Sequence, residues 1–266
     1  MLNIKNYRFI SIAVLTLIII FIHLAYTYDL PKLFRFNKKE ALEEWEEKIF
    51  KNKVLYSVEP KKEGGYLSAK SDKACSGLIY RIKFYPKENP LISWSWKVIK
   101  FPEKKPAQDR DKGGWIEKDD YAARVYAIFP SWYFMNIRSL EYIWDENLPE
   151  GTIITSPYFS NIKLIVTESG RSNIGQWVFE ERDIYQDYKR AFGSAPSGYV
   201  GAIALMTDTD NTLSTAEATY KDIKMGYNYE VKEKEGLGAG PEESRLERMI
   251  KKIKGWVEKN GKNNQQ

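Results

Sequence analysis

Two short acidic segments contain the side chains best suited to binding a ligand or a cation. In the first, Asp119 and Asp120 stand just before a predicted strand that contains Arg124. Adjacent carboxylates at the start of a strand can bind a cation or be held by an arginine. A polar turn with a structural salt bridge is the simpler alternative, and the sequence leaves both interpretations open.

The second acidic segment, residues 206–212, has the densest set of oxygen ligands in the chain, with Asp208, Asp210 and Asn211 close together. Several oxygens near one loop suit a hard cation such as Ca²⁺. The segment is not an EF-hand, because the central Gly and the distal Glu are missing. Alternatively, these side chains close the turn by hydrogen bonding to their own backbone.

Four tryptophans fall in predicted strands. A flat indole ring stacks well on a sugar, although most Trp in a β-sandwich belongs to the core. Trp94 and Trp96 share an alternation face with apolar neighbours, which favours the core. Trp144 precedes an Asp-Glu-Asn turn and Trp177 follows closely after a glycine, so these two are the better candidates for an exposed rim.

The composition excludes several kinds of catalytic site. The chain has 266 residues with one Cys and one His, and that histidine, His23, lies in an N-terminal apolar run. A Ser–His–Asp triad, a Cys–His pair and a multi-Cys zinc site are therefore excluded from the body of the protein. Carboxylates, Tyr, Lys, Arg or an oxygen-bound cation remain. We assign no catalytic residue and favour a role other than that of an enzyme.

The net charge of +5 does not indicate a nucleic-acid-binding protein. From Arg245 onward the chain has seven Lys/Arg and two Glu, so the excess positive charge lies in the C-terminal tail. A nucleic-acid interface would need a basic stripe on the fold itself. We therefore expect no nucleic-acid partner.

The N-terminal region, residues 1–28, is predicted to be a membrane segment. Phe9 to Tyr26 contain no Asp, Glu, Lys or Arg, and a helix of this length spans roughly 27 Å, close to the hydrocarbon thickness of a bilayer. Lys5 and Arg8 precede the run, which favours a cytoplasmic N-terminus. We expect a single-pass anchor in the cytoplasmic membrane with the body on the extracytoplasmic (periplasmic) side. A cleaved signal peptide is the alternative.

The body, residues 37–229, is predicted to be all-β. Short runs of alternating polar and apolar residues are separated by Gly, Pro, Asn and Asp, which is typical of antiparallel sheets with one face in a core. About ten such runs with few helices predict an antiparallel β-sandwich of jelly-roll or lectin-like type. The predicted strands are 54–59, 65–70, 76–83, 91–98, 121–129, 139–144, 152–158, 161–167, 175–182, 198–206 and 216–225.

Two helices are expected within this body. Asn37 and Glu40 resemble a capping box, and the apolar residues that follow fall on one helical stripe up to Phe50. A second helix is predicted over Asp183–Phe192, ended by Gly193.

Beyond the body, the pattern changes again. Residues 230–240 are charged and then Gly-rich, which predicts a flexible linker. Residues 241–259 form an amphipathic basic pattern, which predicts a helix that contacts the membrane surface or packs on protein. The tail, residues 260–266, is expected to be disordered.

Several of these segments, in this order, resemble the bacterial domain of unknown function 3047 family over about residues 40–226. They are WSWKV (94–98), KDDYAARVY (118–126), LEYIW (140–144), WVFEERD (177–183), MTDTDNT (206–212) and ATYKDI (218–223). The resemblance implies an exported or membrane-attached β-sandwich, similar in outline to carbohydrate-binding domains. It points to these positions for a binding site: Trp96, Asp119, Asp120, Arg124, Trp144, Trp177, Arg182, Asp183, Asp208, Asp210 and Asn211.

Three functions fit these observations. The first is a non-catalytic binding module for a glycan or another envelope component, with Ca²⁺ as an optional ligand of Asp208, Asp210 and Asn211. The second is a structural or assembly protein of the envelope, in which the acids and arginines form buried ion pairs. The third is a polysaccharide hydrolase that uses two facing carboxylates. All three assume that the acids and arginines of distant segments converge.

Overall fold

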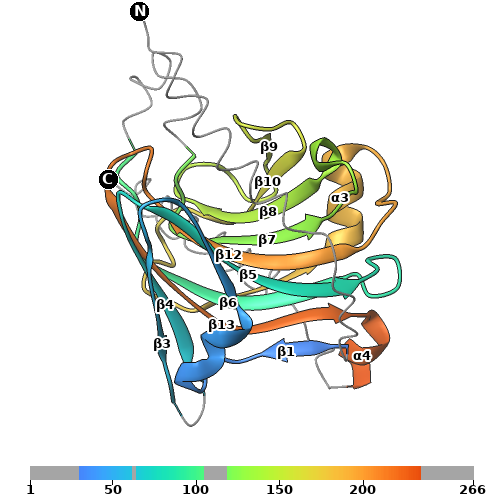
Figure 1. Cartoon of the computed structure of the whole chain (residues 1–266), viewed down its shortest axis with the longest axis horizontal. Coiled ribbons are helices and arrows are strands. Elements are labelled where there is room, and N and C mark those ends of the chain that lie inside the picture. The colour runs from blue at the N-terminus through green and yellow to red at the C-terminus, as the bar shows by residue number, and fades with distance from the viewer. Residues whose placement is uncertain (1–29, 62–63, 105–118, 235–266) are drawn as a thin grey trace, which may run out of the picture. The chain divides into compact units, whose positions relative to one another are not determined.

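The computed structural model describes residues 30–61, 64–104 and 119–234 (Figure 1). The chain divides after Tyr227 into two compact units. The first contains both β-sheets, and the described part of the second contains the short helix α4 (Tyr229–Lys234). The predicted membrane segment 1–28, the basic helix 241–259 and the tail 260–266 lie outside these ranges. Within them, no helix has both the length and the apolar character needed to cross a bilayer.

Among the described strands, six form the first sheet, in the order β11-β6-β13-β4-β3, and β1 pairs with β13 beside that path. All of these neighbours are antiparallel. The bounds are β1 (Lys32–Phe34), β3 (Leu55–Glu59), β4 (Tyr66–Asp72), β6 (Leu91–Lys100), β11 (Val178–Asp183) and β13 (Thr215–Tyr227).

The second sheet has seven of the described strands, in the order β2-β5-β12-β7-β8-β10-β9. It is mixed, because β10 runs parallel to β8 whereas its other neighbours pair antiparallel. The bounds are β2 (Glu46–Lys51), β5 (Cys75–Phe84), β7 (Arg124–Phe129), β8 (Arg138–Asp145), β9 (Ile153–Thr155), β10 (Ile162–Ser169) and β12 (Val200–Asp208). The prediction of an all-β sandwich is confirmed.

The main core lies between the two sheets and is rich in aromatic residues. The alternation predicted for β6 is confirmed, because Trp94 and Trp96 are fully buried there with Ile92 and Val98. Burial of large apolar side chains removes them from water and is the dominant favourable contribution to folding. A period of two in the sequence is thus enough to identify the inward face of this strand.

The outer face of the seven-stranded sheet is also buried over much of its area. Ile79, Tyr126, Ile128 and Met206 form a second apolar cluster there. In β7, Val125 belongs to the main core, whereas Arg124 and Tyr126 point to this outer face. The predicted strand 121–129 begins at Arg124 in the structure, so residues 119–123 approach the sheet as an irregular segment.

The helix predicted from Asn37 to Phe50 was wrong. A short 3₁₀ helix, η1 (Lys39–Glu44), is followed by Trp45 in an extended conformation and then by β2. β2 pairs with β5 from Glu46 to Lys51. This pairing satisfies the backbone at an otherwise open sheet edge, and such a tertiary contact overrides a local helical pattern.

The helix predicted at Asp183–Phe192 is confirmed as α3 (Ile184–Phe192). The Asp183 carboxylate accepts a hydrogen bond from the Gln186 backbone N–H, and Gly193 ends the helix in a left-handed conformation (φ 70°). These are the ordinary N-cap and C-cap roles of Asp and Gly. Another short 3₁₀ turn, η3 (Phe134–Asn136), lies between β7 and β8. The predicted linker 230–240 begins as helix rather than coil, because α4 continues to Lys234.

Candidate functional site

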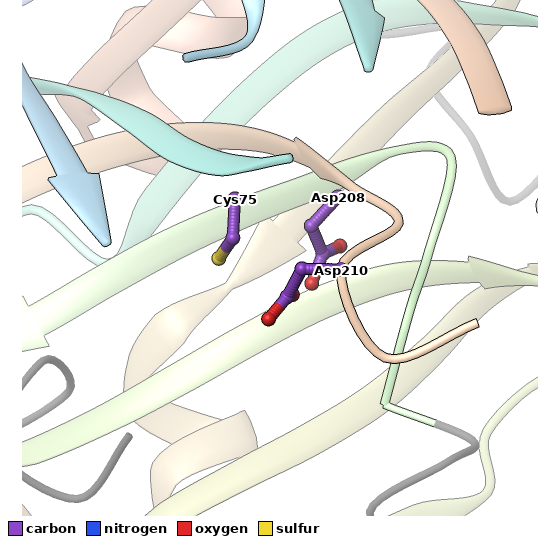
Figure 2. A group of neighbouring side chains, drawn as sticks. All are labelled: Cys75, Asp208 and Asp210. Atoms are coloured by element: carbon purple, nitrogen blue, oxygen red, sulfur yellow. The ribbon is translucent and has the colours of Figure 1, made fainter. Parts of the chain in front are cut away.

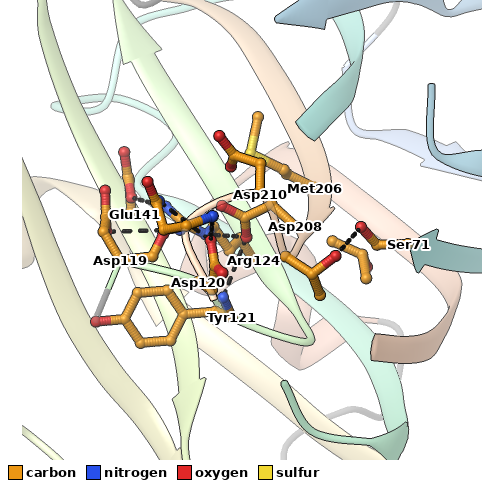
Figure 3. A network of polar contacts seen from close by, with 12 residues as sticks. Ser71, Asp119, Asp120, Tyr121, Arg124, Glu141, Met206, Asp208 and Asp210 are labelled. Carbon is orange, nitrogen blue, oxygen red and sulfur yellow. Dashed lines mark hydrogen bonds and ion pairs between the residues drawn. The ribbon is translucent and has the colours of Figure 1, made fainter. Parts of the chain in front are cut away.

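Arg124 is the centre of a buried polar cluster at one end of the seven-stranded sheet (Figure 3). Its Nε and Nη2 atoms donate to the two carboxylate oxygens of Asp208, at 3.0 and 2.7 Å. Both side chains are only 4% exposed. β7 and β12 are neighbours, and Arg124 stands beside Met206 in their register. The two bonds from Arg124 to the Asp208 carboxylate form a fork-to-fork pair, which is the strongest form of the Arg–carboxylate interaction.

Further groups surround the same guanidinium. Nη1 donates to Glu141 Oε2 at 3.2 Å, and Nη2 donates to the Asp119 backbone oxygen. The Asp119 carboxylate Oδ1 lies 3.5 Å from Nη2, and the guanidinium carbon lies 4.6 Å from the centre of the Tyr121 ring. One guanidinium group therefore contacts three buried carboxyl groups, those of Asp119, Glu141 and Asp208.

Asp120 joins the two acidic segments. Its Oδ1 accepts from the Asn211 side-chain amide at 3.1 Å and from the Asn211 backbone N–H at 3.3 Å. Its Oδ2 accepts from the Thr212 backbone N–H at 2.6 Å. Tyr158, from the loop before β10, donates its hydroxyl to Asn211 Oδ1 at 3.0 Å. The three hypotheses assumed that distant acidic segments converge, and these contacts bring together Asp119, Asp120, Arg124, Asp208, Asp210 and Asn211.

The predicted Ca²⁺ ligands do not form a suitable oxygen cage. Ligand atoms of Cys75, Asp208 and Asp210 lie within 4.8 Å of one another (Figure 2). A thiol is a poor ligand for a hard cation, and burial raises the pKa of Cys75, which favours the protonated thiol. Asp208 is held by Arg124, and Lys51 Nζ lies 3.8 Å from Asp210 Oδ2. These cations neutralise the carboxylates, so the donor set does not fit Ca²⁺.

Burial dominates the ionisation of this cluster. It raises the pKa of Glu141 to about 8 against the opposing effect of Arg124, and the negative charge of Asp119 adds to the rise. Burial likewise raises the pKa of Asp119 to about 6, again opposed by Arg124 and assisted by Asp120. Burial also raises the pKa of Asp208. At neutral pH Glu141 is therefore mainly a neutral carboxylic acid.

These shifts predict how stability depends on pH. The folded state holds the Glu141 proton more tightly than the unfolded state. Protonation of Glu141 therefore stabilises the fold fully below the ordinary pKa of 4.5, and this stabilisation is lost as the pH rises through about 8. Glu141→Gln mimics the neutral acid and does not titrate. Between pH 5 and pH 9 we therefore expect the unfolding free energy of this variant to fall by about 1–3 kcal/mol less than that of the wild type. Urea unfolding of both proteins across this range measures the effect, and parallel curves would contradict it.

Arg182 and Asp183 do not belong to this cluster, which corrects the expectation of one common site. Arg182 binds Asp187 of α3 through two bonds of 2.8 and 2.6 Å, and its guanidinium carbon lies 5.7 Å from the centre of the Tyr142 ring. Asp183 caps α3. Arg182 pairs with Ile92 at the start of β6, at the opposite end of the sandwich from Arg124. Its role is to fasten α3 to the sheets.

The tryptophans separate into core and surface. Trp96 and Trp144 are both fully buried, with ring centres 6.0 Å apart. Neither presents a ring to solvent. The core position that alternation favoured for Trp96 is confirmed, whereas the exposed rim position expected of Trp144 and the binding role that the resemblance implied for both are wrong. Inward alternation in β6 and β8 is the physical reason, because every second side chain of these strands enters the core.

Trp177, in contrast, is 37% exposed. It lies just before β11, at the outer face of the six-stranded sheet. Lys221 Nζ lies 4.7 Å and Lys97 Nζ 5.0 Å from its ring centre, and the Tyr66 ring centre is 5.9 Å away. We call these four residues the Trp177 patch. It combines an accessible aromatic surface with two ammonium groups.

Sequence reasoning missed several members of both groups. Glu141 was overlooked because it is a lone acid within an apolar strand, LEYIW, although a charged residue on a buried strand usually has a charged partner. Lys97 and Lys221 lie on different strands, and only the pairing of β6 with β13 brings them to one face. The sequence did indicate that Lys97 points outward, because it alternates with the core residues Trp94 and Trp96.

The profile of the family described as "Protein of unknown function (DUF3047)" matches residues 43–224. The chain therefore belongs to this family, as its ordered motifs suggested. No curated protein matches the sequence significantly.

Three solved structures show a distant likeness in fold. The K1 cleaved adhesin domain of Lys-gingipain from Porphyromonas gingivalis W83 is 12% identical, with a TM-score of 0.35, over 74% of this chain and 98% of that one. The CBM22-1 xylan-binding domain of Paenibacillus barcinonensis Xyn10C is 10% identical, with a TM-score of 0.33, over 77% and 99%. Endoglucanase 3 of Trichoderma harzianum, from family GH12, is 9% identical, with a TM-score of 0.36, over 75% and 98%.

Proposed function

We propose that this member of the DUF3047 family is a non-catalytic binding module of the cell envelope that binds an acidic glycan through the Trp177 patch. The N-terminal segment would hold it at the outer side of the cytoplasmic membrane. The observation that carries the proposal is Trp177 itself, a partly exposed indole on a regular sheet face with two lysines within 5.0 Å of its ring centre.

The chemistry of the patch fits an anionic sugar. The apolar face of a pyranose can cover an indole ring, and Tyr66 extends the aromatic surface beside Trp177. Lys97 and Lys221 can donate to carboxylate, sulfate or phosphate groups on the sugar. Among the described residues, the carboxylate that pairs with Lys221 is that of Asp222, at 3.8 Å, and the two side chains are 25% and 39% exposed, so water partly screens the pair. An anionic ligand can therefore compete for this ammonium group.

The buried acidic cluster fits a hydrolase less well. A glycosidase needs two carboxylates that face its substrate, several ångströms apart. Asp119 and Glu141 are less than 10% exposed and are directed at Arg124. A pocket on this sheet face is lined by apolar side chains of β2, β5 and β12, with Lys48 and Tyr126 as its polar members. The cluster instead supports a structural role for the family motif, as the second of the three hypotheses expects.

The proposal is tested by Trp177→Ala on an array that contains uronic-acid and sulfated polymers beside neutral xylan and mannan. We expect the wild type to prefer the acidic polymers. Trp177→Ala should lower affinity at least about tenfold, in line with the loss of one stacked ring and its orientation of the sugar.

A matched control is Trp132→Ala, because Trp132 is 90% exposed on a separate loop. Affinity should be unchanged in this variant, and Lys97→Ala with Lys221→Ala should remove the preference for acidic polymers. Equal binding by wild type and Trp177→Ala would refute the site, and so would equal losses in the two tryptophan variants.

A further inference from the structure

The loop between β7 and β8 presents a group of large apolar side chains to solvent. Trp132 is 90%, Tyr133 46% and Met135 47% exposed. The loop is held in place by hydrogen bonds: the Asn136 backbone N–H donates to the Tyr133 oxygen at 2.9 Å, and the Asn161 side-chain amide donates to the Met135 oxygen at 2.5 Å. An ordered, exposed aromatic loop of this kind is typical of an interaction site.

Other exposed aromatic surface lies at the same end of the sandwich. β5 and β7 end there, and β12, which pairs antiparallel with both, begins there. Tyr85, directly after β5, is 45% exposed, and its ring centre lies 6.0 Å from that of Tyr199, directly before β12. We call this the α3 end, because Asp183, directly before α3, pairs with Leu91 at the start of β6, and Figure 1 shows α3 at that end.

Four positive side chains lie at the α3 end, of which Lys83 and Lys87 are exposed and Arg138 and Lys163 half-buried, and the half-buried acid Asp183 lies there too. Lys83 Nζ lies 4.7 Å from the centre of the Tyr199 ring, and Arg138 and Lys163 lie over the Phe192 ring at 4.9 and 6.0 Å. Lys87 is exposed on the loop after β5, where Glu88 is an exposed acid. Tyr and Trp beside Lys and Arg are the combination that favours the headgroup region of a bilayer containing anionic lipid.

The described chain also begins at this end. The side chains of Leu30 and Phe84 pack over Gly226, where a Cβ would lie 2.7 and 3.2 Å from them. Gly226 is near the end of β13, and Phe84 ends β5. The apolar run predicted to enter the membrane ends at Tyr26, four residues before Leu30. Four residues span at most about 14 Å, so the α3 end must stay close to any bilayer that holds the run.

We propose that the α3 end faces the membrane and that Trp132 and Tyr133 insert into the headgroup region of a bilayer containing anionic phospholipid. The inference rests on the membrane anchoring included in the proposed function. It adds the orientation of the sandwich and a second membrane contact. The Trp177 patch, on the outer face of the other sheet, remains a separate site for the glycan.

The test uses the full chain in nanodiscs of phosphatidylethanolamine with a minority of phosphatidylglycerol. Cys75→Ser removes the single thiol, and a fluorophore is attached through Trp132→Cys or, as the matched control, through Leu55→Cys. Leu55 is 62% exposed and pairs with Lys70 near the end of β4, at the end of the sandwich away from α3. Fluorescence is quenched either by a lipid-borne nitroxide or by aqueous iodide.

We expect nitroxide quenching to be at least about threefold stronger at position 132 than at position 55, because an inserted side chain lies at the headgroup–acyl boundary. Iodide should show the reverse order. Equal iodide quenching at both positions in chains that co-elute with nanodiscs would overturn the inference alone. A chain that does not enter nanodiscs would overturn the anchor, and the inference with it.

Discussion

Arg124→Ala is expected to lower the unfolding free energy by about 3–5 kcal/mol, which is the usual effect of removing one partner of a buried ion pair. The substitution leaves the buried Asp208 carboxylate, now 2.7 Å from Arg124 Nη2, without its counter-ion. Asp119 loses the same cation, and Glu141 loses a hydrogen-bond donor. Chemical denaturation at neutral pH measures the loss.

Two further variants separate the causes of this loss. Arg124→Lys keeps the charge but not the planar fork, so we expect an intermediate loss. Arg35→Ala is the control for an exposed arginine, because the side chain of Arg35 is 62% exposed and lies 3.8 Å from Asp222, whose side chain is 39% exposed. Its effect should stay within about 0.5 kcal/mol. If Arg124→Ala costs no more than Arg35→Ala, the cluster does not stabilise the fold.

The buried Arg124–Asp208 pair makes the acidic motif a poor target for a test of ligand binding. A loss of ligand binding in Asp208→Ala would be ambiguous, because this substitution strands Arg124 in the core of its cluster. A surface residue such as Trp177 is the better probe of binding, since its removal leaves no buried charge.

Trp96→Ala is expected to lower the unfolding free energy by a similar amount, about 3–5 kcal/mol. The ring is fully buried between Trp94 and Trp144, at centre-to-centre distances of 5.4 and 6.0 Å. Truncation removes this apolar contact and leaves a cavity that the flanking rings cannot fill. Thermal and urea unfolding of the two proteins measure the difference.

Trp96→Phe and Trp177→Ala provide the comparison. Within the described structure the Trp96 indole N–H has no hydrogen-bond partner, so Phe loses only volume and should cost less than Ala. Trp177→Ala should cost under about 1 kcal/mol, since its ring is partly in water. If Trp177→Ala is as destabilising as Trp96→Ala, the division into core and surface tryptophans is incorrect.

Local patterns predicted most of the β-structure because strand alternation and turn residues act over short distances. The inward face of β6 and the caps of α3 at Asp183 and Gly193 are read directly from neighbouring residues. The segment from Asn37 to Phe50 shows where this fails. Its apolar spacing suits a helix, but β5 offers an unpaired edge, and the chain from Glu46 forms a strand there.

The class of fold and the family follow from the sequence alone, because alternation and ordered motifs are properties of the chain itself. The convergence of the two acidic segments was a hypothesis, which the pairing of β7 with β12 decided. Tertiary structure alone decided that Arg124 and Arg182 lie at opposite ends, that Trp96 and Trp144 are buried, and that Lys97 and Lys221 flank Trp177. The physical reason is strand pairing. Register and sheet order determine which distant side chains share a face, and no local pattern encodes them.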